Sequence, residues 1–228
     1  MPDIARLHNW AARFEPRDAA DALVVTEVWA RNDYRIGPAG LSGVVVDVGA
    51  NVGAFSVLAA KAGADVVHAY EPHPANRARL QHHLTLNRVA DRVVVHPEAV
   101  AEKTGDVVWL TGVGGGVHIA GEGDATARTV SLADILGEVG PVEFLKHDAE
   151  GAEWQTFESV TAELLRDQVR RIALEWHGPN MGPHLTHIGD DGQYIGRWHC
   201  LVELLADSGR LEIVGHPAVG GLMHWSSY

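Results

Sequence analysis

The stretch VVVDVGANVGAFS, residues 44–56, decides the fold because an apolar strand in it runs directly into a glycine-rich turn and a helix. Residues 44–48 are apolar apart from one aspartate, which suits a short buried strand, and residues 51–63 have helical spacing and end at Gly63. Glycine in such a turn lets the backbone approach a neighbour closely and adopt positive φ. The turn therefore either lies against a ligand or makes a tight strand-to-helix connection without one.

The same alternation of strand and helix continues after this turn. We expect further strands at 65–71, 91–100, 142–148 and 169–177, and helices at 73–88, 131–139 and 151–167. Unbroken apolar strands are typical of parallel sheets buried on both faces, and their alternation with helices favours right-handed βαβ units. The sequence predicts an α/β fold with a mainly parallel sheet and helices on both faces.

The remaining segments complete this prediction. We expect a strand at 105–110, a loop at 111–125 and a helix at about 195–208. Strands at 210–214 and 221–227, joined by the short link GHPAVG, predict an antiparallel hairpin at the sheet edge. The first forty residues have an amphipathic helical pattern that ends in a Gly/Pro loop at 36–43. We therefore expect a helical extension or lid at 1–42 and one α/β domain at 43–228.

Composition narrows the class of partner. The chain has 228 residues, 46% of them apolar, and a formal charge of −12. This charge disfavours nucleic acids and anionic membrane surfaces, which are bound by basic faces. A single cysteine fits a reducing compartment, the N-terminus lacks the apolar centre of a signal peptide, and no apolar run approaches the ~20 residues that span a bilayer. We expect a cytoplasmic protein.

An acid on the next strand indicates what the glycine turn binds. Glu71 ends the second strand, 22 residues after Gly49, at the spacing of an acid that accepts both hydroxyls of a ribose. Asn51 stands where the dinucleotide fingerprint has its second glycine, which weakens an NAD interpretation. An acid at Asp47 would oppose a diphosphate and suit a ligand with a cationic amino-acid end. S-adenosylmethionine combines such an end with a ribose and an adenine, and it is the cofactor we expect.

Five stretches in this order carry a family resemblance: VVVDVGANVGAFS, VHAYEPHPANRARLQHHLTLN, VVVHPEAVAEKTGDV, VSLADIL and VEFLKHDAEGAEWQTFE. Together they resemble the FkbM family of S-adenosylmethionine-dependent methyltransferases over residues 44–177. The resemblance implies a class I methyltransferase fold, Rossmann-like, with a seven-stranded sheet whose last strand is antiparallel. The antiparallel hairpin expected from residues 210–227 agrees with it.

The resemblance also implies roles for individual residues. Asp148, at the end of the fourth main strand, would face the sulfonium and the substrate. His147 departs from the family pattern at the preceding position, and strand alternation directs it to the other face. The implied cofactor residues are Asp47, Gly49, Asn51 and Gly53 for the methionine part, Glu71 and Pro72 for the ribose, Glu98 and Ala99 for the adenine, and Asp148.

Candidate bases lie at the ends of the fourth and fifth main strands. A hydroxyl or amide acceptor must lose a proton during methyl transfer, and HDAEGAE supplies Asp148, Glu150 and Glu153 for this step. LEWHGPN supplies Glu175 and His177, which strand alternation places on one face. We expect His177 to be the base, because histidine titrates near neutrality, with Glu175 orienting it and Asp148 completing the catalytic set. The acids that open the helix also suit its N-terminal dipole, and His177 also suits a buried core position.

Other histidines define the expected acceptor site. His184 and His187 lie in a Gly/Pro-rich stretch and, with Glu150, are the expected substrate contacts. Together with His177 they have the number of ligands that zinc needs, but not a regular ligand spacing, so we expect no metal. An Mg²⁺ ion held by Asp148 and Glu175 is an alternative that the spacing alone does not establish.

These observations predict an S-adenosylmethionine-dependent methyltransferase that acts on a hydroxyl of a small molecule, either a natural product or a sugar. N-methylation of an amide, carbamoyl or amine group is the nearest alternative. An NAD-dependent reductase and a nucleoside-binding module without turnover are less favoured. The expected partners are a small-molecule acceptor and a second copy of the chain packed on the N-terminal helices, with no nucleic acid and no membrane.

Overall fold

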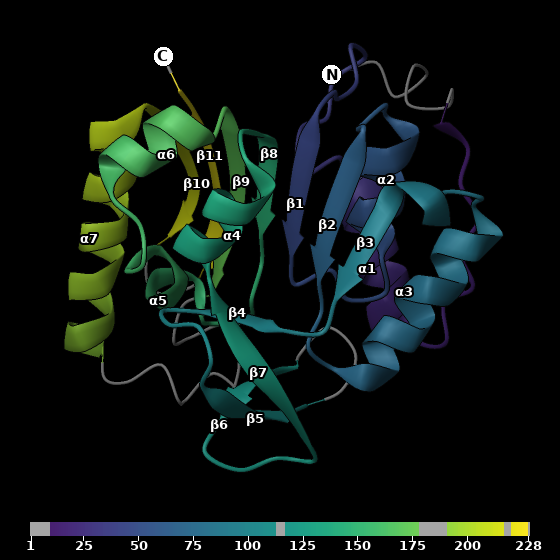
Figure 1. Cartoon of the computed structure of the whole chain (residues 1–228), viewed down its shortest axis with the longest axis horizontal. Coiled ribbons are helices and arrows are strands. Elements are labelled where there is room, and N and C mark those ends of the chain that lie inside the picture. The colour runs from purple at the N-terminus through teal and green to yellow at the C-terminus, as the bar shows by residue number, and fades with distance from the viewer. Residues whose placement is uncertain (1–9, 113–116, 178–190, 217–219, 228) are drawn as a thin grey trace.

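The computed structural model describes residues 10–112, 117–177, 191–216 and 220–227. Its centre is a seven-stranded sheet with the strand order β10-β11-β9-β8-β1-β2-β3 (Figure 1). All neighbouring strands from β9 to β3 are parallel, whereas β11 is antiparallel to both β9 and β10. The strands are β1 (Val44–Val48), β2 (Val66–Tyr70), β3 (Val93–His96), β8 (Val142–His147), β9 (Arg171–His177), β10 (Arg210–His216) and β11 (Gly220–Ser226). The mainly parallel sheet and the C-terminal antiparallel hairpin are confirmed.

Helices cover both faces of this sheet (Figure 1), as predicted. One apolar core lies between the sheet and α1 (Ala19–Thr26), α2 (Ala54–Lys61) and α3 (Pro74–Leu86). The other lies beneath α4 (Leu132–Val139), α5 (Glu153–Phe157), α6 (Ala162–Gln168) and α7 (Asp191–Ser208). Alternate residues of β1 enter opposite cores, Val45 on one side and Val46 on the other. This is why the strand is an unbroken apolar run in the sequence.

The order of the strands reverses at β1, which pairs with β2 on one side and β8 on the other. In an open parallel sheet, such a reversal separates the loops that follow the two neighbouring strands and leaves a crevice at their carboxyl ends. The ends of β1, β2, β8 and β9 therefore define the region where a ligand site is expected.

A second, smaller sheet lies at this carboxyl edge (Figure 1). Its strand order is β4-β7-β5-β6, formed by β4 (Ala99–Ala101), β5 (Val107–Thr111), β6 (His118–Ala120) and β7 (Ala125–Ser131). The prediction of one strand at 91–100 was wrong, because β3 ends at His96 and β4 pairs with β7 outside the main sheet. The prediction of a loop over 111–125 was also wrong, because β6 lies within it and pairs with β5. The glycine-rich sequence of that stretch shows no strand pattern. Strand β6 is stabilised by its pairing with β5 and not by the strand propensity of its own residues.

Other element boundaries differ for local reasons. The helix predicted from residue 51 begins at Ala54, because Asn51 and Gly53 have φ values of 50° and 84° that a right-handed helix does not allow. The helix predicted over 151–167 is two helices, and Thr161 caps the second. The expected cap of α4 by Ser131 is confirmed, since its side chain accepts a hydrogen bond from the Asp134 backbone.

The N-terminal segment packs on α2 and α3. Its helical part is α1 followed by a π-helical turn, Glu27–Arg31, and the described residues before α1 are mostly not helical. Val28, Tyr34 and Ile36 are buried in the same core as α2. The boundary at residue 42 and the role as a lid stay predictions. In the described part of the chain, no helix has the length and apolar character needed to cross a bilayer.

Candidate functional site

A pocket lies at the carboxyl edge of the sheet, between the main sheet and the small one. The turn after β1, the end of β2 and the segment after β8 form its floor, and β4, β5 and β6 contribute apolar side chains opposite. Tyr70 and Asn76 also line it. The predicted site residues on its wall are Gly49, Asn51, Glu71, Pro72, Ala99, Asp148 and Glu150.

Gly49 is required by the fold as well as by the pocket. Its φ is 71°, and a Cβ at this position would lie 1.7 Å from the backbone oxygen of Asp148. The amides of Gly49 and Ala50 both donate to the carbonyl of Tyr70. The turn therefore packs against the backbone that follows β8. Glycine is needed at position 49 because these two chain segments approach closely, whether or not a ligand binds. The turn still forms part of the pocket wall.

Glu71 is an acid held inside the pocket wall. Only 4% of its surface is exposed, and its two oxygens accept hydrogen bonds from the backbone amides of Asn51 and His73, each at 2.8 Å. Burial raises the pKa of Glu71 to about 7, although these two amides oppose the shift. Each carboxylate oxygen can accept a second hydrogen bond, so the group retains acceptor capacity for a ligand.

Asp47 has internal partners instead of a place on the wall. It is fully buried, accepts a hydrogen bond from Ser56 at 2.6 Å, and lies 3.3 Å from the Nζ atom of Lys146. The same ammonium donates to the carbonyls of Val48 and Gly49 at 3.1 and 2.7 Å. A lysine thus occupies the space beside Asp47 that the sequence assigned to the cationic end of a ligand.

Two other predicted cofactor residues also lie off the wall. Gly53 is packed against α3, where a Cβ would meet Leu80 at 3.1 Å, and it is the N-cap of α2. Glu98 is half-buried before β4, whereas its neighbour Ala99 lines the pocket. Gly53 therefore affects the pocket only indirectly, by allowing the turn between β1 and α2 to pack against α3.

Asp148 is oriented by its neighbours. Its Oδ2 atom accepts a hydrogen bond from the Tyr34 hydroxyl at 3.4 Å and lies 3.4 Å from Lys146 Nζ. Its Oδ1 atom is buried and has no hydrogen-bond partner among the described residues. This free oxygen lies 3.8 Å from His177 Nε2, at the inner end of the pocket.

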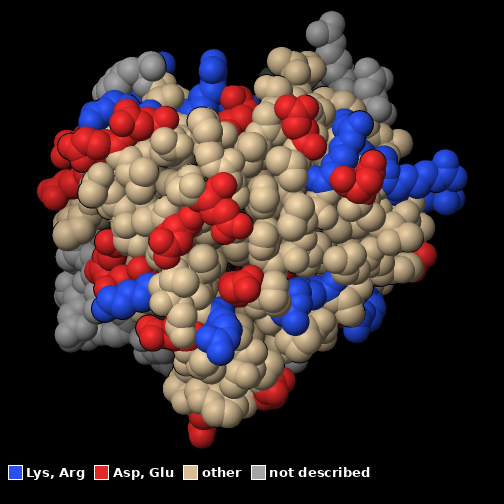
Figure 2. All heavy atoms as spheres, in the orientation of Figure 1, with Lys and Arg blue, Asp and Glu red and all other residues tan. Residues whose placement is uncertain are grey.

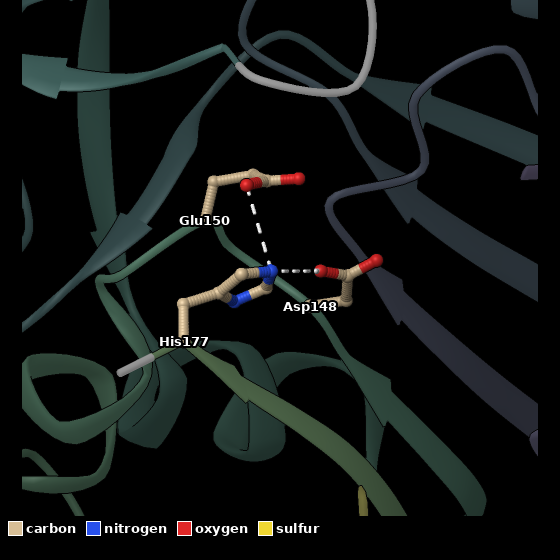
Figure 3. Close-up of side chains that lie close together, drawn as sticks. All are labelled: Asp148, Glu150 and His177. Atoms are coloured by element: carbon tan, nitrogen blue, oxygen red, sulfur yellow. Dashed lines mark ion pairs between the residues drawn. The ribbon is translucent and has the colours of Figure 1, made fainter. Parts of the chain in front are cut away.

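His177, at the end of β9, is buried against several acids (Figure 3). Its Nδ1 atom is 3.0 Å from Glu153 Oε1, and its Nε2 atom is 3.5 Å from Glu150 Oε2. Glu153 also accepts from the amides of Ala149 and Gly151, at 3.1 and 3.0 Å. The residue that orients His177 is therefore Glu153, and the expectation that Glu175 does so is wrong. Glu153 opens a helix, which suggested a dipole role, and its contact across to β9 has no local signal in the sequence.

Burial and mutual repulsion set the protonation of these groups. Burial opposes a charge on His177, but Glu153, Glu150 and Asp148 raise its pKa well above 6.5. Burial likewise opposes ionisation of Glu153, but His177 lowers its pKa to about 2. Burial and neighbouring acids raise the pKa of both Glu150 and Glu175 to about 8. At neutral pH, Glu150 and Glu175 are therefore mostly protonated, and a cationic His177 pairs with an ionised Glu153 beside the pocket.

The remaining predicted residues do not join this cluster. His147 is fully buried, packs on Phe157, and has a pKa lowered to about 4 by burial. It points away from the pocket, as alternation along β8 predicts. His184 and His187 lie outside the described residues.

Comparison with known proteins identifies the fold. The family model for the methyltransferase FkbM domain matches residues 47–207. Among solved structures, methyltransferase FkbM from Methylobacillus flagellatus KT superposes with a TM-score of 0.51 at 18% identity, covering 97% of this chain and 58% of that one. The METTL16 methyltransferase domain superposes with a TM-score of 0.54 at 10% identity, covering 97% and 75%. A search of curated protein sequences finds no match.

The two structural similarities support the fold alone, because both identities are low. They confirm the predicted class I methyltransferase fold. The seven-stranded sheet, parallel except for antiparallel β11, is the one predicted for this fold. The family match spans the turn after β1, the acid at the end of β2 and the carboxyl ends of β8 and β9. The chain therefore belongs to the FkbM methyltransferase family.

Proposed function

We propose that the protein is an S-adenosylmethionine-dependent methyltransferase that acts on a hydroxyl group of a small molecule. The observation that carries this proposal is the continuity between two parts of one pocket. The pocket wall around Glu71 leads directly to Asp148 and Glu150, which follow β8. A cofactor and an acceptor can thus meet at Asp148, which lines the pocket and contacts the cluster around His177.

The residues present fit this cofactor. Glu71 has acceptor capacity for ribose hydroxyls, and Ala99, Val100 and Ile119 offer apolar surface for an adenine ring. Lys146 does not line the pocket, but its ammonium fixes the turn after β1 through the carbonyls of Val48 and Gly49. Asp47 supports the site by holding this lysine. Bound there, S-adenosylmethionine supplies an electrophilic methyl carbon, and the electrons of the broken carbon–sulfur bond pass to sulfur.

The chain then has two tasks, alignment and removal of a proton. Alignment of the acceptor oxygen with the methyl carbon contributes up to ~7–11 kcal/mol to catalysis of such reactions, and a base typically contributes ~10²–10⁴-fold. The hydroxyl proton passes to the acidic cluster, in which Asp148, Glu175 and His177 are the catalytic candidates. Glu153 positions the imidazole, and Glu150 lies on the acceptor side of the pocket.

Two features support a small acceptor over a nucleic acid. The formal charge of the chain is −12. On the face drawn in Figure 2, the Lys and Arg side chains of the described residues are interspersed with Asp and Glu. A binding site for a nucleic acid backbone instead gathers basic side chains on one face.

The test combines calorimetry with product analysis. The protein should bind S-adenosylhomocysteine and not NADH, and it should convert S-adenosylmethionine to S-adenosylhomocysteine in the presence of a hydroxylated acceptor. Glu71→Gln should weaken nucleoside binding by ~1–3 kcal/mol, whereas Glu158→Gln, at an exposed acid, should not. Tandem mass spectrometry of the product separates O- from N-methylation. Saturable NADH binding would contradict the proposal, and so would binding without turnover across hydroxylated, amine and amide acceptors.

A further inference from the structure

Three ligand-type atoms face one another at the inner end of the pocket. Within the described chain, Asp148, Glu150 and His177 each offer one such atom, and the three atoms lie within 4.8 Å of one another. Figure 3 shows both carboxylates directed at the same nitrogen, Nε2 of His177. The residues come from the end of β8, the segment after it and the end of β9, so the fold itself brings them together.

The distances in this group are too long for direct hydrogen bonds. His177 Nε2 is 3.5 Å from Glu150 Oε2 and 3.8 Å from Asp148 Oδ1. A charged N–H donor lies ~2.7–2.9 Å from a carboxylate oxygen. Two ligand atoms that each lie ~2.0–2.2 Å from one ion are instead ~2.8–3.8 Å from each other, when the ligand–ion–ligand angle lies between the octahedral ~90° and the trigonal ~120°. The spacing thus leaves a gap between the nitrogen and the two oxygens that matches a shared ion.

One of the oxygens at this gap lacks a hydrogen-bond partner. Asp148 Oδ1 is buried without a hydrogen-bond partner in the described structure, whereas Tyr34 and Lys146 hold the other oxygen of this carboxylate. His177 is buried, with 5% of its surface exposed, and its Nε2 atom faces the two carboxylates. A buried polar atom without a partner is costly, so this oxygen would gain from a cation at the gap.

The histidine is also held as a metal ligand would be. Glu153 is 2% exposed and bonds the Nδ1 side of the ring at 3.0 Å. Backbone amides of Ala149 and Gly151 fix that carboxylate in turn. A carboxylate on one ring nitrogen places the lone pair of the other nitrogen toward a metal, and such outer partners are a regular feature of metal-binding histidines.

We propose that Asp148, Glu150 and His177 bind one divalent cation of the Mn²⁺ class through two carboxylate oxygens and one imidazole nitrogen. Binding of the cation would displace the protons of His177 and Glu150, so that two carboxylates and a neutral imidazole balance its charge. Both acids line the pocket, so the open coordination positions face the acceptor. Sequence spacing favoured no metal, with Asp148 and Glu175 as the alternative pair, because spacing does not show that Glu150 and His177 converge.

The role of the cation rests on the proposed function. Its open positions would take two oxygens of the acceptor, which favours acceptors with neighbouring hydroxyl groups, such as a sugar diol. Glu175 is not one of the three ligands and remains beside them to receive the hydroxyl proton. The binding site itself stands without this role, and its test is therefore separate from turnover.

The test measures Mn²⁺ binding to the purified, metal-stripped protein without cofactor. Electron paramagnetic resonance of free Mn²⁺ and calorimetry should give one site per chain. Asp148→Asn, Glu150→Gln and His177→Gln should each weaken binding at least tenfold, and Glu153→Gln should weaken it about 10–100-fold through the ring orientation. Glu158→Gln is the matched control and should bind as the unaltered protein does. Circular dichroism confirms that each variant is folded.

Two results would overturn the proposal: no binding at millimolar Mn²⁺, or equal binding by the control and all three ligand variants. S-adenosylhomocysteine binding, measured on the same samples, separates the two proposals. Mn²⁺ bound at this site without nucleoside binding would leave the metal site standing and remove the methyltransferase proposal. If the protein binds the nucleoside and its turnover does not change on metal removal, and it binds no Mn²⁺, the methyltransferase proposal stands and the metal site is removed.

Discussion

Binding of the nucleoside should be linked to a proton on Glu71. Burial raises the pKa of this acid to about 7. Ribose hydroxyls donate hydrogen bonds, so they favour the ionised carboxylate and should lower this pKa in the complex. The sign follows directly: the protein without ligand holds the proton below pH 7, the complex releases it, and affinity rises with pH.

The magnitude follows from the fraction ionised. A group with a pKa of about 7 is roughly one-tenth ionised at pH 6 and nine-tenths ionised at pH 8. If the ionised form alone binds well, the Kd for S-adenosylhomocysteine should fall about tenfold between these pH values, which equals ~1.4 kcal/mol. At pH 7, about half a proton should leave Glu71 for each molecule bound.

Calorimetry measures both quantities. Titrations at pH 6, 7 and 8, repeated in two buffers of different ionisation enthalpy, give the affinity and the number of protons released. Other acids near the pocket also titrate, so the Glu71 contribution is the difference between the unaltered protein and Glu71→Gln. Equal pH slopes for the two proteins, or an affinity that falls with pH in the unaltered protein alone, would refute the reasoning.

Three further variants test the fold and the cluster. Gly49→Ala should destabilise the protein by about 3–5 kcal/mol in urea unfolding, because the new Cβ meets a carbonyl at 1.7 Å and the φ is positive; a loss below ~1 kcal/mol would contradict this account of the turn. Arg79→Ala leaves Asp21, which is 2% exposed, without its guanidinium partner and should cost about 1.5–3 kcal/mol, because the Arg17 amide still donates to this carboxylate. An unchanged midpoint would show that water replaces the arginine. Glu153→Gln should lower kcat by about 10–100-fold with nucleoside affinity unchanged, and a fall in nucleoside affinity instead would place Glu153 in the cofactor site.

The sequence predicted the main sheet because each of its strands carries its own signal. Strand β1 is an apolar run that needs no partner to be recognised, and the hairpin of β10 and β11 is marked by its short link. The small sheet has no comparable signal. Strand β6 has three residues and exists because β5 pairs with it. Its contributions to the pocket, His118 and Ile119, were therefore absent from the predicted site.

In the candidate site, too, the sequence predicted some residues correctly and missed a contact that depends on packing. Glu71 was predicted to line a pocket from one spacing along the chain, and the structure places it on the wall. The partner of His177 was assigned to Glu175, two residues away, whereas Glu153 makes the contact from a helix 24 residues earlier. Alternation along a strand gives the face of a side chain but not the element packed on that face.

Lys146 shows why a charge motif alone cannot assign a ligand. In the sequence, Asp47 is an acid in a cofactor turn without a visible counter-charge, so a cationic ligand was the natural inference. The parallel pairing of β1 with β8 places Asp47 opposite Lys146 in register, and the buried ammonium neutralises that acid. The lysine also donates to the turn and lies beside Asp148. One buried cation thus couples the shape of the turn after β1 to the orientation of Asp148, so loss of Lys146 should disturb both parts of the pocket wall together.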